Sequence, residues 1–195
     1  MTDKNIEYYN ENAESFFNNT VNADMSFWRD KFESYVVDGG RILDAGCGCG
    51  RDSRAFKQHG FSIVAFDASR EMCRMASELL GEEVWQMRFD EIAFDEEFDG
   101  IWACASLLHV PEDELPSVLK RLHKALKANG KLYVSFKYGE GTRQRGERTF
   151  CDFTEETLQE LLKDADFEIK ESGITTDIRP GRDDEKWVNA IAEKE

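Results

Sequence analysis

The sequence predicts an α/β fold in which a mostly parallel sheet carries helices on both faces. Apolar stretches alternate with amphipathic ones, the stretch at 41–45 runs into a glycine-rich turn, and the stretch at 61–67 ends in a carboxylate. With 195 residues, 41% of them hydrophobic and 33% charged, the chain has the size and composition of a single globular domain, 1–195. Ligands are expected at the carboxyl ends of the parallel strands.

The N-terminal segment, residues 1–35, precedes the predicted sheet. Its aromatic residues recur at helical spacing in two groups, first Tyr9, Phe16 and Phe17, then Phe27, Trp28, Phe32 and Tyr35. We therefore predict two short amphipathic helices between about residues 5 and 35. Two roles are open for these helices: they form a lid over the site, or they only cover the edge of the core.

The core of the predicted domain, 41–195, alternates strands and helices. Seven strands are expected, at about 41–45, 61–67, 83–87, 99–105, 131–138, 167–176 and 186–192. Helices are expected at about 51–59, 69–80, 111–130 and from Thr154 onward, where capping residues and glycines mark their ends. The last two strands are joined by a turn at 179–182 and must be antiparallel. The segment 139–147, rich in glycine and charge, is expected to be a loop.

The glycine-rich turn points to a nucleotide-like ligand. Gly46, Gly48 and Gly50 stand at alternate positions, where a ligand can approach the backbone without meeting a Cβ atom. The dinucleotide fingerprint G-x-G-x-x-G would need another glycine where this chain has Arg51, which argues against NAD or FAD.

Two carboxylates accompany this turn. Asp67 ends the second strand, where it can accept hydrogen bonds from both hydroxyls of a ribose, and Asp44 lies close enough to influence a bound cation. Together they suit a ligand that has a ribose and a positive charge.

Three motifs of the chain resemble those of the class I S-adenosylmethionine-dependent methyltransferases. They are D-A-G-C-G-C-G-R-D-S from Asp44, F-D-A-S from Phe66 and F-D-G-I-W-A-C-A-S-L-L-H-V from Phe98. The resemblance extends from about Tyr8 to the C-terminal strand, and is nearest to small bacterial enzymes described as acting on small molecules or as tellurite-resistance-like. It implies S-adenosyl-L-methionine as the cofactor and a Rossmann-like sheet of seven strands that ends in an antiparallel hairpin.

The resemblance also implies which residues meet the cofactor. Asp67 is expected at the ribose hydroxyls and Asp44 at the amino acid end. The full set of expected cofactor contacts is Asp44, Gly46, Cys47, Gly48, Gly50, Asp67, Ala68, Ser69, Met87, Arg88, Phe89 and Cys104. A capping role alone is the alternative for Ser69, and a place in the core is the alternative for Met87 and Phe89.

His109 is the candidate general base because it follows the fourth strand, beside which the resemblance places the acceptor. A structural, hydrogen-bonded role is the alternative. Acceptor contacts are expected from Tyr9, His109, Lys137, Tyr138, Arg143 and Arg179. The cations among them suit a carboxylate or phosphate of the acceptor, and the same holds for Arg145, Arg148 and Arg182. The alternative is a solvated loop whose arginines pair with Glu140, Glu147, Asp183 and Asp184.

Charge and cysteine content argue against several classes of function. Forty acidic against 25 basic residues give a net charge of −15, which disfavours a nucleic acid partner. The absence of a long apolar stretch and of a signal pattern predicts a cytoplasmic protein with no membrane partner. Cys47 and Cys49 lack a second ligand pair at zinc spacing, so no metal is expected.

The leading hypothesis is a methyltransferase that uses S-adenosyl-L-methionine to methylate a small acceptor, for which the basic residues suggest an anion. We expect a monomer or a homodimer. The alternatives are a non-catalytic module that binds the cofactor or its demethylated product, and a methyltransferase acting on RNA or protein. A nicotinamide oxidoreductase ranks last because of Arg51.

Overall fold

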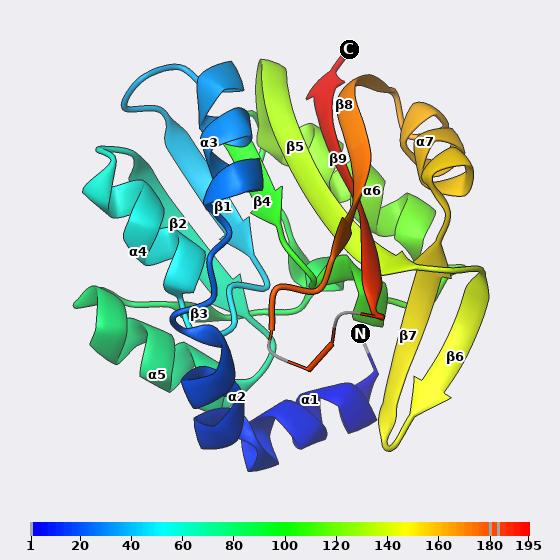
Figure 1. Cartoon of the computed structure of the whole chain (residues 1–195). Helices are drawn as coiled ribbons and strands as arrows, with labels where there is room; N and C mark the ends of the chain where they lie inside the picture. The colour runs from blue at the N-terminus through cyan, green and yellow to red at the C-terminus, as the bar shows by residue number, and fades with distance from the viewer. Residues whose placement is uncertain (1, 180, 183) are drawn as a thin grey trace.

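The computed structural model describes residues 2–179, 181–182 and 184–195. These residues form a nine-stranded sheet with the strand order β3-β2-β1-β4-β5-β7-β6, in which β9 also pairs with β5 and β8 pairs with β9 (Figure 1). The strands are β1 Arg41–Ala45, β2 Ser62–Asp67, β3 Trp85–Gln86, β4 Phe98–Ala103, β5 Leu126–Tyr138, β6 Gly141–Arg145, β7 Arg148–Phe153, β8 Phe167–Thr176 and β9 Lys186–Lys194. Pro180, in the predicted turn, and Asp183 lie outside the described residues.

Helices cover both faces of this sheet, as predicted. They are α1 Asp3–Glu11, α2 Ala13–Thr20, α3 Ser26–Tyr35, α4 Arg51–Gln58, α5 Arg70–Leu80, α6 Leu115–Ala125 and α7 Glu155–Lys163, with short 3₁₀ turns η1 Phe89–Glu91 and η2 Leu107–His109. None of the helices in the described part of the chain has the length and apolarity that crossing a membrane requires. The α/β class, the mostly parallel sheet and the antiparallel C-terminal pair are confirmed.

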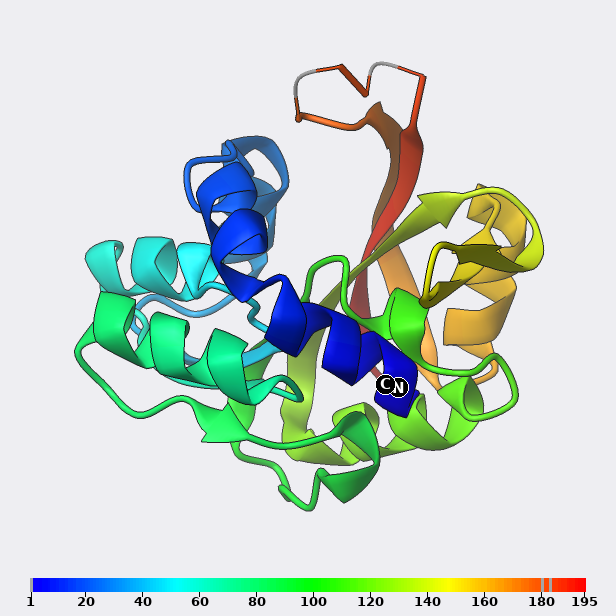
Figure 2. The same cartoon turned by 90° about the horizontal axis from the view of Figure 1, so that it is seen from below.

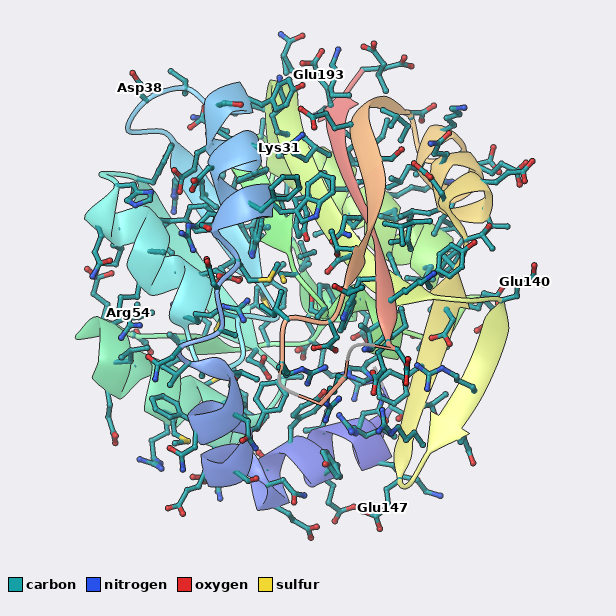
Figure 3. All side chains as sticks on the ribbon, in the orientation of Figure 1. Lys31, Asp38, Arg54, Glu140, Glu147 and Glu193 are labelled. Atoms are coloured by element: carbon teal, nitrogen blue, oxygen red, sulfur yellow. The ribbon has the colours of Figure 1, made fainter. Side chains whose placement is uncertain are left out.

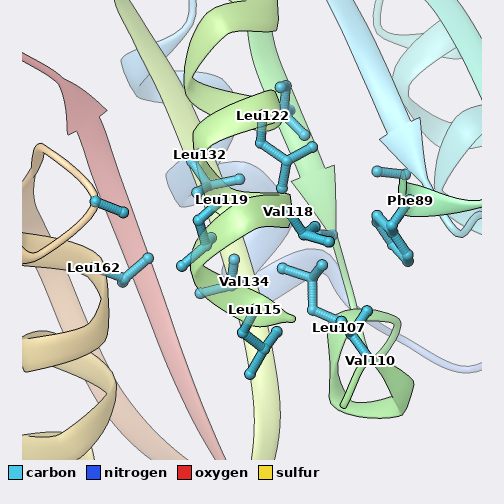
Figure 4. Packing of buried hydrophobic residues seen from close by; sticks show 14 of the residues in the cluster. Phe89, Leu107, Val110, Leu115, Val118, Leu119, Leu122, Leu132, Val134 and Leu162 are labelled. Atoms are coloured by element: carbon cyan, nitrogen blue, oxygen red, sulfur yellow. The ribbon is translucent and has the colours of Figure 1, made fainter. Parts of the chain in front are cut away.

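The two faces have separate cores because successive strand residues point in opposite directions. On β1, Ile42 packs with α3 and α4, whereas its neighbour Leu43 belongs to the larger cluster on the face of α6 and α7. Figure 4 shows this larger cluster, where the leucines and valine of α6 meet Leu132 and Val134 of β5. Charged side chains such as Asp38, Glu140 and Glu147 are exposed at the periphery (Figure 3).

The segment 139–147 is not the loop that the sequence predicted. Its greater part is β6, which forms an antiparallel hairpin with β7, and Gly146 turns the chain with φ +61°. Apart from Thr142, β6 consists of glycine, glutamine and arginine, and its residues are mostly exposed, so hydrophobic patterning does not reveal it. Strand β7 was missed as well, and the two together raise the number of strands from seven to nine.

Other boundaries also differ from the prediction. The N-terminal segment forms three helices instead of two, because α1 and α2 are separated at Asn12. Helix α6 is shorter than predicted, and Asn129, with φ +60°, lies with Gly130 inside the long strand β5. The predicted strand 83–87 is reduced to Trp85–Gln86 at the edge of the sheet.

The carboxyl edge of the sheet is covered by elements from distant parts of the chain. Figure 2 views the molecule from this edge and shows α1 crossing it, with the β6–β7 hairpin and the outer end of β8–β9 to one side. Lys137 pairs with β7 on one side and with β9 on the other, so both strands converge where β5 ends. The covered edge is where ligands of parallel α/β sheets bind.

Gly46→Ala should lower the free energy of unfolding by about 2–4 kcal/mol, since φ is +78° and a Cβ atom would lie 2.5 Å from the Cβ atom of Ser106. Gly81→Ala is the matched control, because φ is +67° but the space around it is open. Its cost should be about 1–2 kcal/mol. Equal losses in urea denaturation would show that the contact with Ser106 is unimportant.

Candidate active site

A cavity of about 410 Å³ lies at the carboxyl edge, within the size range of ligand pockets. Its walls come from the glycine turn after β1, the end of β2, η1, the segment from Cys104 to His109, and the ends of β5, β7, β8 and β9. Helices α1, α2 and α3 contribute Tyr9, Phe16 and Trp28. Segments far apart in the sequence therefore enclose one space.

The glycine turn is fixed by hydrogen bonds to the end of β2. The N–H groups of Gly46 and Cys47 both donate to the carbonyl oxygen of Phe66, at 2.9 Å each. The Asp67 carboxylate accepts from the N–H of Gly48 at 2.9 Å and from the N–H of Ser69 at 2.8 Å. Burial raises the pKa of Asp67, and these N–H donors oppose that shift. Each carboxylate oxygen keeps a further lone pair for a ligand in the cavity.

Asp44 is a second carboxylate on the cavity wall. It is buried, and one of its oxygens accepts hydrogen bonds from the N–H and the hydroxyl of Ser53, at 3.1 and 2.6 Å. Burial, together with the negative charge of Asp52, raises the pKa of Asp44 to about 7. Burial and Asp52 thus disfavour the ionised carboxylate of Asp44, and a cation bound nearby would favour it.

Arg51 also lines the cavity and forms a bidentate pair with Asp52, whose carboxylate further accepts a hydrogen bond from the indole N–H of Trp102 at 2.9 Å. Sequence reasoning used Arg51 only to argue against a dinucleotide. Its position next to the third glycine, Gly50, was the available signal that its side chain reaches the site.

His109 is buried and has partners on both ring nitrogens. Nδ1 lies 2.9 Å from the carbonyl oxygen of Thr149, which can only accept, so Nδ1 carries the proton. Nε2 is then the acceptor for the hydroxyl of Tyr9, at 2.8 Å. Burial lowers the pKa of His109 to about 4. The imidazole is therefore neutral at neutral pH and has a basic nitrogen aimed at Tyr9.

Helix α1 is tied to both sides of the cavity. Asn5 exchanges two hydrogen bonds with the backbone of Thr149 in β7, at 3.1 and 2.9 Å. At the other end, the side-chain oxygen of Asn10 accepts from the hydroxyl of Ser69 and from the N–H of Glu71. Between these anchors the partly buried Tyr9 lines the cavity, where α1 crosses the carboxyl edge of the sheet (Figure 2).

Six cationic side chains line another part of the cavity, and among the described residues three carboxylates pair with them. The cations are Lys137, Arg143, Arg145, Arg148, Arg179 and Arg182. Their partners are Asp152, Asp177 and Glu185, of which Asp177 and Glu185 each pair with more than one cation. As the sequence-based alternative of a solvated loop expects, Arg143 and Arg145 keep 40% and 52% of their side chains exposed. All six cations nevertheless line the cavity.

Most of the sequence-predicted residues meet at this cavity. Those that line it are Tyr9, Asp44, Gly46, Cys47, Gly48, Asp67, Ala68, Met87, Phe89, Cys104, His109, Lys137, Arg143 and Arg179. Burial raises the pKa of the Cys104 thiol to about 12, so this residue stays protonated at neutral pH.

Four predicted residues lie elsewhere. A Cβ atom on Gly50 would meet the Cβ atom of Ala76 at 3.1 Å, so this glycine allows α4 and α5 to pack closely. Ser69 caps α5 and binds Asn10, Arg88 binds Asp3 and Asp90, and the side chain of Tyr138 is largely exposed.

Protonation of His109 should make the fold less stable in acid. Below pH 6.5 the unfolded chain takes up a proton at this imidazole, whereas the folded protein takes it up only near pH 4. The free energy of unfolding should therefore fall by up to about 3 kcal/mol as the pH decreases through this window. In His109→Gln this part of the loss is absent. Urea denaturation of both proteins at about pH 7 and about pH 4.5 measures it, and equal losses would contradict the prediction.

Comparisons with known proteins agree with the site. Residues 42–130 match a family model described as a methyltransferase domain. A Staphylococcus carnosus protein named as an uncharacterized methyltransferase is 28% identical over 180 residues, which cover 82% of this chain and 86% of that protein.

Solved structures share the fold. One is the 1,6-didemethyltoxoflavin-N1-methyltransferase of Burkholderia thailandensis, with bound 1,6-didemethyltoxoflavin and S-adenosylhomocysteine, at a TM-score of 0.79 and 22% identity over 97% of this chain and 84% of that one. Another is a TehB-like methyltransferase of Corynebacterium glutamicum, at a TM-score of 0.73 and 20% identity over 97% of this chain and 100% of that one. Together with the motifs, the matched methyltransferase domain and these similarities support a class I S-adenosylmethionine-dependent methyltransferase with S-adenosyl-L-methionine as its cofactor.

Proposed function

We propose that this enzyme transfers the methyl group of S-adenosyl-L-methionine to a small, anionic acceptor bound in the same cavity. The observation that carries the proposal is the continuity of the cavity. It is lined by the glycine turn and Asp67, and also by Tyr9, His109 and the six cationic side chains. A module that only bound the cofactor would need no space beyond it.

The chemistry of the residues present fits the cofactor. The carboxylate of Asp67 suits the ribose hydroxyls, and Gly48 leaves its backbone open apart from the ring of Phe16, 3.5 Å from where a Cβ atom would lie. Met87 and Phe89 offer apolar surface for the adenine. Asp44 and Arg51 have the charges that the ammonium and carboxylate groups of the amino acid end require.

When bound, the cofactor supplies a methyl group already activated by the sulfonium, so the protein mainly has to align the acceptor. Tyr9 and His109 are placed to handle a proton if the acceptor atom carries one. The Tyr9 hydroxyl covers Nε2 of His109, which is neutral at neutral pH and can accept a proton. In this proposal His109 is the base, and the Tyr9 hydroxyl is the group hydrogen-bonded to its Nε2 atom.

The charge of the cavity favours an anionic acceptor. In the part of the cavity away from the glycine turn, six cations against three carboxylates leave a local excess of positive charge in a protein whose net charge is −15. Because these cations line one cavity, they suit a small molecule better than a nucleic acid backbone, which is bound along an extended basic surface.

Asp67→Ala should weaken binding of S-adenosylmethionine and S-adenosylhomocysteine by about 1–3 kcal/mol, because charge-assisted hydrogen bonds to the ribose are lost. Calorimetric titration measures this change. Asp95→Ala is the control, since Asp95 is an exposed carboxylate that pairs with Lys124 away from the cavity. Heat from NAD but not from either sulfur nucleoside would refute the proposed function.

Binding of S-adenosylmethionine should strengthen as the pH rises to about 7 and then level off. Below that pH Asp44 holds a proton, which must leave before the carboxylate can attract a cation. The affinity should fall by up to about tenfold for each pH unit below 7. In Asp44→Asn this dependence should disappear. If the variant keeps the same slope in calorimetry, another group is responsible.

A further inference from the structure

Arg148, the first residue of β7, differs from the other cations of the cavity. Each of the other five has a carboxylate within ion-pair distance. Arg148 has none among the described residues, and its Nε atom is buried without a hydrogen-bond partner. Arg148 is partly buried, and a partly buried cation without a counterion favours the binding of an anion at this point.

The surroundings of Arg148 orient its guanidinium group. The Cζ atom lies 4.4 Å from the centre of the Tyr8 ring and 5.1 Å from the centre of the Phe150 ring. Aromatic rings hold a guanidinium in place and leave its N–H edge available.

Arg143 brings a second guanidinium to the same ring. Its Cζ atom lies 5.0 Å from the centre of Phe150, and it pairs with Asp152 through Nε, which leaves its terminal nitrogens for another acceptor. The two arginines are brought together by the β6–β7 hairpin, in which Arg143 pairs with Phe150 across the strands. Both therefore flank Phe150 in the wall of the cavity.

Arg148 and Phe150 adjoin the proposed proton-transfer pair, Tyr9 and His109. Nη1 of Arg148 lies 3.4 Å from the hydroxyl oxygen of Tyr9, which itself donates to His109. Phe150 also packs against His109, with ring centres 4.8 Å apart. An anion held by Arg148 would thus lie beside the Tyr9–His109 pair.

We propose that Arg148 and Arg143 form a subsite that binds a carboxylate or phosphate group of the methyl acceptor, next to the atom that receives the methyl group. The planar forks of two arginines match the oxygens of either anion. The proposal rests on the proposed function, and it narrows the acceptor to small molecules whose anionic group lies close to the methylated atom.

The test is calorimetric titration of the S-adenosylhomocysteine-saturated protein with inorganic phosphate and, separately, with benzoate. Saturation keeps both anions from Arg51 and the cofactor's part of the cavity. We expect at least one of them to bind at one site per chain. Stronger binding of phosphate supports a phosphorylated acceptor, and stronger binding of benzoate supports a carboxylic acid. Absence of saturable binding by both anions would overturn the subsite.

Substitutions of Arg148 test whether this arginine is responsible for the anion binding. Arg148→Gln should weaken it at least tenfold, and Arg148→Lys, which keeps the charge but loses the fork, should weaken it less. Arg74→Gln makes the same change of charge on α5, where Arg74 is exposed and paired with Glu71 and Glu78. It should leave anion binding within twofold of the wild type, and an equal loss in Arg74→Gln and Arg148→Gln would overturn the assignment.

Binding of S-adenosylhomocysteine to each variant shows that its cavity is folded, and it separates the two proposals. If S-adenosylhomocysteine binds and neither anion does, the subsite fails while the proposed function stands. If S-adenosylhomocysteine does not bind the wild-type protein, the proposed function fails, and the subsite fails with it.

Discussion

The hydrogen bonds that Gly48 and Ser69 donate to the Asp67 carboxylate hold the site together. They join the glycine turn after β1 to the loop after β2. From Ser69 the connection continues through Asn10 into α1, and α1 places Tyr9 against His109. The Asp67 carboxylate therefore links the part of the cavity proposed for the cofactor to helix α1. A ligand bound to Asp67 would contact the carboxylate that holds Ser69, and Ser69 in turn helps to position α1 and Tyr9.

The distribution of charge follows from the same architecture. The protein has a net charge of −15, yet β5, β7 and β9 converge at the carboxyl edge of the sheet, where cationic side chains line one wall of the cavity. Asp177 and Glu185 neutralise part of this charge, and their arginine and lysine partners keep the pKa of each carboxyl well below its usual range. Within the described part of the chain, Arg148 is the cation of this group that has no carboxylate partner, and it lies where α1 meets β7.

The hairpin β6–β7 shows where sequence patterning fails. A strand exposed on both faces lacks alternating hydrophobic residues, and Arg143 and Arg145 read equally well as a charged loop. Only pairing with β7 orders this segment. Similarly, Asn129 and Gly130 look like the end of a helix, but Leu126 pairs with Phe98 and draws the chain into β5. Long-range pairing overrode a local signal in both places.

The sequence by itself determined the α/β class, the glycine turn, the terminal carboxylate Asp67 and the cofactor family, because these depend on local periodicity and on residues adjacent in the chain. The tertiary structure alone decided that Gly50 serves helix packing, that Arg148 has no carboxylate partner among the described residues, and that Tyr9 covers His109 from 100 residues away. These features depend on which side chains from distant parts of the sequence come into contact, and the spacing of residues along the chain does not specify those contacts.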